Sequence, residues 1–208
     1  MAKLFFHWGS MDAGKSTLLL QTEHNYRAKG MDCHLLTARL DDRAGEGFIA
    51  SRLGLRSPAK TFARDDDLFE KIMIPAQAAK VAAVLCDEAH FLTQQQVMQL
   101  ARGVDELNIP VLTYGLRTDF RMHPFEGAAA LLAIADVIRE MRSICECGRA
   151  ATAVLRLDAS GTAVFTGPQV QIGGNASYKS VCRRHWFQAF RQQDEAAMDL
   201  ASARDQRG

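Results

Sequence analysis

A glycine-rich segment near the N-terminus carries a lysine and a serine at a spacing that binds phosphate. Residues 9–16 read Gly-Ser-Met-Asp-Ala-Gly-Lys-Ser and match the pattern G-x-x-x-x-G-K-S/T in full. Glycines let backbone N–H groups approach phosphate oxygens, and the N-terminus of a following helix adds further N–H groups and a positive dipole. Lys15 suits the β- and γ-phosphates, and the Ser16 hydroxyl suits Mg²⁺. A chance glycine-lysine loop is the alternative, which the flanking apolar run and helical pattern disfavour.

Two carboxylates follow a second apolar run further along the chain. Val81–Cys86 predicts a strand that is buried on both faces, and Asp87 and Glu88 come directly after it. Ligands of open parallel sheets bind beyond the carboxyl ends of the strands, so this pair and the phosphate loop belong at one edge. There Asp87 is placed to bind Mg²⁺ directly or through water, and Glu88 to orient or deprotonate a nucleophile. The alternative is an acidic pair that merely favours a helix N-terminus; His90 either faces the nucleotide or is structural.

A third group of residues has the chemistry of a metal site. Cys145 and Cys147 form one potential ligand pair, and Cys182 and His185 form another. Three thiolates and one imidazole make a four-coordinate structural zinc site. Reduced thiols without a metal are the alternative, because the C-x-C spacing is tighter than the usual C-x₂₋₄-C. The remaining cysteines, Cys33 and Cys86, lie in strand-like runs and are expected to be buried apolar side chains.

Short apolar runs alternate with helical patterns over the first two thirds of the chain. A polar, glycine-containing stretch over Asp41–Ser57 predicts a long mobile loop, and Thr93 with Gln96 predicts a capped helix N-terminus. The alternation favours an α/β fold with a mostly parallel, helix-covered sheet, here of the RecA-like P-loop NTPase type. The expected strands are Lys3–His7, Cys33–Thr37, Val81–Cys86, Val111–Tyr114 and Asp136–Met141; the expected helices are Lys15–Lys29, Asp66–Ile72, one that begins after Thr93 and one that ends at Leu131–Ala135.

The character of the sequence changes near Cys145, where glycine, threonine and valine become frequent. Ala153–Leu157 is a strand candidate in this part. We therefore expect a nucleotide-binding α/β domain over residues 1–142, a small zinc-ribbon-like β domain over residues 143–190, and a polar tail over residues 191–208.

Composition excludes several classes of protein. The 208 residues contain 25 Lys and Arg against 24 Asp and Glu, a net charge of +1, which argues against an electrostatic binder of nucleic acid or of a membrane surface. The longest apolar stretch, residues 128–135, is far too short to span a bilayer. The N-terminus has no secretory pattern, and five cysteines do not make a disulfide scaffold, so we expect a cytoplasmic protein.

Taken together, these motifs resemble the type II thymidine kinases, the cellular and bacterial class, from about Lys3 to about Phe190. The resemblance rests on an ordered set of segments: Gly9–Thr17, Asp87–Phe91, Tyr114–Phe120 with Phe125, Val170–Cys182, and the cysteine and histidine set. It implies transfer of the γ-phosphoryl group of ATP to the 5′-hydroxyl of thymidine, with Mg²⁺ accompanying ATP and a structural Zn²⁺. It also implies a homotetramer, feedback inhibition by dTTP, and a lasso loop over the nucleoside.

The resemblance also implies roles for individual residues. Glu88 matches the proton acceptor. ATP and its phosphates are assigned to Gly9, Ser10, Met11, Asp12, Ala13, Gly14, Lys15, Ser16, Thr17, Asp87, Ala89 and His90, with Asp41 and Arg43 in the polar loop, and Mg²⁺ to Ser16 and Asp87. Thymidine is assigned to Met11, Phe91, Leu116, Phe120, Phe125, Val170, Gln171, Ile172, Gly173 and Tyr178, and zinc to Cys145, Cys147, Cys182 and His185. The C-x-C spacing and the histidine depart from many relatives, which have C-x₂-C and a fourth cysteine.

Two alternatives stay open on the residues alone. The aromatic side chains could be ordinary core residues, judged on spacing. The whole chain could instead be a nucleotide-dependent module that reads nucleic acid through its zinc ribbon. Thymidine-dependent consumption of ATP separates the nucleoside kinase from this second class.

Overall fold

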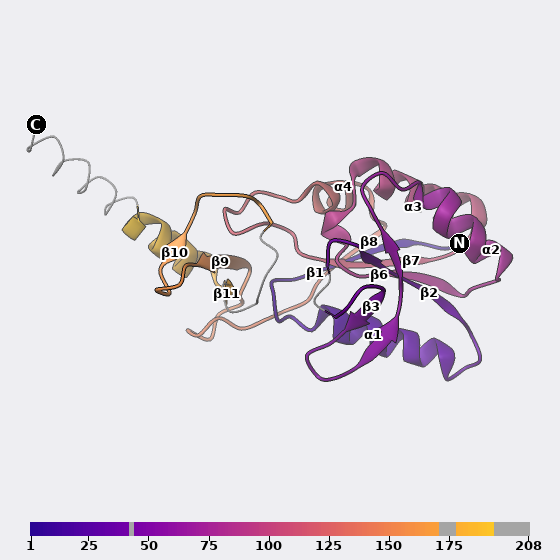
Figure 1. Ribbon diagram of the computed structural model, residues 1–208, viewed down its shortest axis with the longest axis horizontal. Coiled ribbons are helices and arrows are strands. Elements are labelled where there is room, and N and C mark those ends of the chain that lie inside the picture. Colours follow the sequence, from indigo (N-terminus) through magenta and orange to yellow (C-terminus); the bar gives the residue numbers. More distant parts are fainter. Residues whose placement is uncertain (42–43, 171–177, 194–208) are drawn as a thin grey trace, which may run out of the picture. The chain divides into compact units, whose positions relative to one another are not determined.

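The computed structural model describes residues 1–41, 44–170 and 178–193 (Figure 1). The chain forms two compact units: Met1–Arg117 with Pro124–Met141, and Thr118–His123 with Arg142–Gly208. The six residues 118–123, which sequence analysis placed with the nucleotide-binding part, thus belong to the second unit.

A six-stranded sheet forms the centre of the first unit. Its order is β5-β2-β6-β7-β1-β8, and every neighbouring pair is parallel. The predicted α/β class with a mostly parallel sheet is confirmed. The strands are β1 (Leu4–Trp8), β2 (Cys33–Ala38), β5 (Lys60–Phe62), β6 (Ala83–Cys86), β7 (Val111–Gly115) and β8 (Val137–Glu140).

Helices cover both faces of this sheet, as parallel strands require for their crossover connections. Figure 1 shows α1 on one face and α2, α3 and α4 on the other. The helical elements are α1 (Lys15–Arg27), the π-helical η1 (Phe69–Met73), α2 (Ile74–Ala78), the 3₁₀ turn η2 (Ala89–Phe91), α3 (Gln94–Leu107) and α4 (Glu126–Ile134). None of the helices in the described ranges is long and apolar enough to cross a membrane.

Local sequence chemistry fixes where α3 begins. The hydroxyl of Thr93 accepts a hydrogen bond from the Gln96 N–H, and the Gln96 side chain accepts one from the Thr93 N–H, each at 3.1 Å. This reciprocal cap satisfies two donors that the helix itself leaves unpaired. Because α3 follows the acidic segment Asp87–Glu88 closely in the chain, its cap also restricts the path of the backbone between β6 and α3.

The polar stretch predicted as a loop contains a short hairpin. Strands β3 (Phe48–Ala50) and β4 (Arg56–Pro58) pair in antiparallel fashion. Ile49 is buried against α1, in a cluster with Leu19 and Leu20, and the Ser57 hydroxyl donates to the Glu23 carboxylate at 3.2 Å. The prediction of a long mobile loop over Asp41–Ser57 is therefore wrong where β3 and β4 form, because three-residue strands carry too short a pattern to detect.

The second unit is built on a small antiparallel sheet with the order β10-β9-β11. Its strands are β9 (Ala153–Leu157), β10 (Ala163–Val164) and β11 (Tyr178–Val181), and residues 183–193 are helical. Phe165 and Trp186 are central to its core and pack edge to face with ring centroids 5.2 Å apart. The indole N–H of Trp186 donates to the carbonyl oxygen of Phe120 at 2.8 Å, which ties residues 118–123 to this unit.

Candidate functional site

The glycine-rich loop connects β1 to α1, as its pattern predicts. Gly14 caps α1 in the left-handed conformation with φ 76°. Gly9 has no room for a side chain, because a Cβ there would lie 2.5 Å from the carbonyl oxygen of Met141. The Lys15 ammonium group lies over the loop and donates to the carbonyl oxygens of Gly9 at 3.3 Å and Ser10 at 2.7 Å. The loop thus has the tight backbone and the overlying cation that a phosphate group needs.

The two motifs singled out in the sequence meet at one edge of the sheet. Asp87 follows β6, is buried, and accepts a hydrogen bond from the Ser16 side chain at the start of α1. Burial, and next the neighbouring Glu88 carboxylate, raise the pKa of Asp87, while the bond from Ser16 and the charge of Lys15 oppose that shift. A carboxylate paired with a hydroxyl beside a phosphate loop is the donor set that Mg²⁺ favours. The two side chains therefore fit a magnesium ion that accompanies a nucleotide.

Glu88 adopts a backbone conformation that is uncommon for a residue with a side chain. Its φ is 50°, in the left-handed region, and its N–H donates to the Asp87 carboxylate at 3.0 Å. Such conformations cost free energy and concentrate at functional positions. The Glu88 side chain is 12% exposed, against 0–4% for the residues that surround the end of β6. Glu88 is therefore the more exposed of the two carboxylates at this strand end.

His90 is held as part of the framework. Its ring is buried, and its Nδ1 accepts a hydrogen bond from the Leu116 N–H at 3.2 Å. The same nitrogen lies 3.4 Å from the Glu88 carboxylate. Gly115 makes the packing possible, since a Cβ there would lie 2.9 Å from the His90 backbone nitrogen. Of the two roles that sequence analysis left open for His90, this geometry favours the structural one.

Aromatic side chains gather beside the acidic segment in the first unit. The ring of His90 lies 4.1 Å from that of Phe91 and 4.5 Å from that of Phe125, and these two phenylalanines meet edge to face. Leu116 follows β7 in the same unit. Phe120, Val170 and Tyr178 belong to the second unit, and the predicted thymidine contacts Gln171, Ile172 and Gly173 lie outside the described residues.

The four predicted metal ligands come together in the second unit. Their ligand atoms all lie within 4.8 Å of one another. The Cys145 Sγ is 3.2 Å from His185 Nδ1, and the Sγ atoms of Cys147 and Cys182 are 3.7 Å apart. Burial opposes ionisation of Cys145, but hydrogen bonds from the backbone of Cys147 and Cys182 and from His185 lower its pKa to about 6. A thiolate is the form that binds a metal, so the cluster can hold a metal ion.

The tight C-x-C spacing is accommodated by a turn. The Gly148 N–H donates to the Cys145 carbonyl oxygen at 2.8 Å, and Gly148 has φ 80°. The turn brings both sulfur atoms to the same side despite the single intervening residue. Cys86 in β6 is buried, as expected, whereas Cys33 in β2 is only half-buried.

One residue near the phosphate loop was missed by sequence analysis. The guanidinium group of Arg52, at the turn of the β3–β4 hairpin, forms an ion pair with the Asp12 carboxylate inside the glycine-rich loop. The two are 40 residues apart, and no periodicity signals the contact. Asp41 lies just beyond the end of β2, and its predicted partner Arg43 is outside the described residues.

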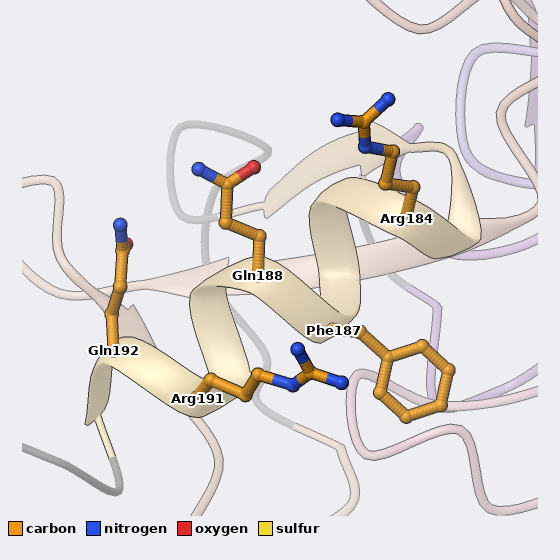
Figure 2. A pocket seen from close by; sticks show the side chains of 5 residues that line it. All are labelled: Arg184, Phe187, Gln188, Arg191 and Gln192. Carbon is orange, nitrogen blue, oxygen red and sulfur yellow. The ribbon is translucent and has the colours of Figure 1, made fainter.

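A separate open hollow of about 600 Å³ lies along the helical residues 183–193. Figure 2 shows that side chains on this helix line it: Arg184, Phe187, Gln188, Arg191 and Gln192. None of these is a predicted site residue, and nothing described in the structure covers the hollow.

The fold and the paired motifs define a class of protein. The parallel sheet carries a glycine-rich phosphate loop after β1 and an acidic pair after β6. This is the architecture of a P-loop nucleotide-binding protein. The family model "Thymidine kinase" matches residues 2–186, and the chain belongs to that family.

Relatives match over nearly their full length. The thymidine kinase of Ruegeria pomeroyi is 56% identical over 91% of this chain and 96% of its own length. The thymidine kinase of Agrobacterium fabrum is 53% identical over 91% of this chain and 98% of its own length. The thymidine kinase of Salmonella paratyphi A is 51% identical over 91% of this chain and 92% of its own length. Among solved structures, Bacteroides Pif1 bound to ssDNA is matched with a TM-score of 0.34 at 12% identity over 67% of this chain and 38% of that one, which is too distant to carry an argument.

Proposed function

We propose that the protein transfers the γ-phosphoryl group of ATP to the 5′-hydroxyl of thymidine, giving dTMP and ADP. The observation that carries the proposal is the meeting of the phosphate loop with Asp87 and Glu88, in a chain of the thymidine kinase family. Phosphoryl transfer needs mainly positioning and charge stabilisation, so a phosphate cradle, a metal site and a base suffice.

The phosphate loop binds ATP in this proposal. Backbone N–H groups of residues 9–14 and the start of α1 surround the phosphates, and Lys15 exchanges its carbonyl partners for phosphate oxygens. Ser16 and Asp87 would hold Mg²⁺, which would neutralise part of the negative charge of the phosphates. The remaining proposed contacts to ATP are Thr17, Ala89, Asp41 and Arg43, while His90 keeps its structural role.

Glu88 accepts the proton of the 5′-hydroxyl. Its side chain is the more exposed of the two carboxylates after β6, and burial keeps the Asp87 carboxyl away from the acceptor. The strained backbone at Glu88 aims this carboxylate independently of Asp87. Since the hydroxyl must be activated as the phosphoryl group is transferred, a positioned carboxylate is the appropriate base.

Thymidine binds to apolar and aromatic groups in this proposal. A neutral pyrimidine suits aromatic surfaces that have a few backbone hydrogen-bonding groups nearby. The proposed contacts are Met11, Phe91, Leu116, Phe120, Phe125, Val170, Gln171, Ile172, Gly173 and Tyr178. A lasso in residues 170–174 would exclude water, which otherwise competes as the phosphoryl acceptor.

The proposed domains, metal site and assembly of the protein follow from the same resemblance. In this proposal residues 1–142 form the nucleotide-binding domain, apart from residues 118–123, which go with the zinc-binding and lasso domain of residues 143–190; residues 191–208 form a polar tail. The metal at Cys145, Cys147, Cys182 and His185 is a structural Zn²⁺, which the donor set of three sulfurs and one nitrogen supports. Resemblance to the type II class supports a homotetramer inhibited by dTTP, and the free cysteines, all five of which are described, suit a cytoplasmic location.

Purified protein supplied with Mg²⁺ and ATP tests this function directly. We expect ADP to form only when thymidine is added, with dTMP produced in equal amount, and DNA or RNA to have no effect. ATP hydrolysis that nucleic acid stimulates, without phosphorylation of thymidine, would overturn the proposal in favour of a nucleic-acid-dependent ATPase.

A further inference from the structure

An arginine is buried in the second unit without a carboxylate partner among the described residues. Arg156 lies in β9 and is only 6% exposed. Its Nη1 donates to the carbonyl oxygen of Pro168 at 2.9 Å, and its Nη2 donates to that of Thr166. The centre of the guanidinium group lies 3.9 Å from the centroid of the Phe120 ring. One side chain thus contacts two separate segments of the unit.

Burying a charge is unfavourable unless hydrogen bonds and favourable charge interactions compensate for lost hydration. At Arg156 the compensation comes from two carbonyl dipoles and the face of an aromatic ring. A planar, charged guanidinium group can donate from two nitrogens in its plane while its face lies on a ring; a tetrahedral ammonium group has no such face. The arrangement therefore depends on arginine in particular.

The segment that Arg156 holds is shaped to receive it. Gly167, between the two acceptor residues, has φ 103°, a conformation that side chains rarely adopt. A Cβ at Gly167 would lie 2.7 Å from Nη2 of Arg156. Glycine is therefore required both for the backbone conformation and for the close approach of the guanidinium group.

Phe120 is fixed from two directions. Its ring lies under Arg156, while its carbonyl oxygen accepts the hydrogen bond from Trp186. The Phe120 side chain is 1% exposed, so the orientation of its ring is set by these neighbours. Phe120 and Val170, which follows the segment 166–168, are both proposed contacts of thymidine.

We propose that Arg156 is a positioning residue for nucleoside binding: it locks the Phe120 ring to the backbone of residues 166–168, and so sets the distance between two parts of the thymidine site. Arg156 acts through these groups and does not touch the substrate. The inference rests on the proposed function. It assigns Arg156 to the acceptor side of the reaction and leaves the ATP side independent of it.

The test compares R156M, which keeps an unbranched flexible side chain but removes the charge and the donors, with R156K, which keeps the charge. The matched control is R191M, since Arg191 is exposed on the helix of the same unit. We expect R156M to raise the KM for thymidine by about 10- to 100-fold, since misplaced binding groups lose affinity steeply. The KM for ATP should change less than about twofold. R156K should recover part of the loss, and R191M should match the wild-type enzyme.

Zinc content and melting temperature are measured on the same preparations. If Arg156 had a merely structural role, its substitution would alter both of these and would raise the KM for thymidine and for ATP alike. If R156M does not fold, G167A perturbs the same contact from the other side and should raise the KM for thymidine alone.

An unchanged KM for thymidine in R156M would overturn the inference, and so would a parallel rise in the KM values for thymidine and ATP. If G167A is used instead, the same two results would overturn it. A wild-type enzyme that does not phosphorylate thymidine would overturn the proposed function as well, so the two failures are distinguishable.

Discussion

At the scale of single residues, the two adjacent carboxylates after β6 have different surroundings. Asp87 is buried and accepts a hydrogen bond from Ser16, and its pKa is raised by burial and by the neighbouring Glu88 carboxylate. Glu88 has a left-handed backbone conformation, and its side chain is partly exposed. Two groups of the same chemistry can therefore have separate tasks, one toward a metal ion and one toward the acceptor hydroxyl.

Replacement of Glu88 by glutamine tests the second task. The E88Q variant keeps the shape and the hydrogen-bonding reach but has no basic carboxylate, so kcat should fall by about 10²- to 10⁴-fold. ATP binding, measured by calorimetry, should be retained because Glu88 makes no proposed phosphate contact. E106Q is the control, since the Glu106 carboxylate is half-exposed and pairs with Arg102 on α3. A kcat for E88Q equal to that of the wild type would remove Glu88 from the mechanism.

At the scale of elements, the β3–β4 hairpin contacts both helix α1 and the phosphate loop. Ile49 and Ser57 anchor the hairpin on α1, and Arg52 at its turn pairs with Asp12. Asp12 places a negative charge inside the loop that is proposed to bind the phosphates of ATP, and this charge by itself would repel them. Arg52 therefore neutralises a charge that is unfavourable to nucleotide binding.

Substitution of Arg52 tests this coupling of hairpin and loop. R52Q should raise the KM for ATP by about two- to fivefold, the range expected for a half-exposed charge pair. D12N combined with R52Q should reverse most of that rise, because no unpaired carboxylate then remains. The four KM values form a double-mutant cycle that serves as its own control, and additive effects would show that the pair is not coupled.

The elements also show how far the sequence could predict this structure. The strands that carry the phosphate loop and the acidic pair were predictable, because long buried runs and a complete motif give strong local signals. The hairpin was not, since its three-residue strands are stabilised by contacts with α1 that are distant in sequence. Arg156 was missed for a related reason. Its partners are backbone carbonyl groups and a ring, and no pattern of residue types reports them.

At the scale of the whole molecule, near-neutral charge agrees with a protein that holds an anionic nucleotide locally. The chain has 25 basic and 24 acidic residues, so no general attraction to polyanions is expected. The phosphate loop instead concentrates N–H groups and one lysine at a single point. A neutral nucleoside as acceptor needs no charged surface either.

Stability is distributed unevenly between the two units. The second unit has a small core, and two of its buried residues are the ligands Cys145 and Cys182 themselves. A core of this size is marginal without an added constraint. The metal site therefore belongs to the core of this unit.

Removal of a ligand should consequently damage the second unit more than an ordinary cysteine substitution damages the first. Elemental analysis should find about one zinc ion per chain of the wild type, and C182A should lose most of it, because three ligands bind more weakly than four. Since metal binding contributes directly to folding free energy, C182A should also melt at a lower temperature. C33A is the matched control: Cys33 is half-buried in β2, outside the cluster, so this variant should retain its zinc and most of its stability. A wild-type preparation that is free of metal yet fully stable and active would show that the four side chains hold the unit together without zinc.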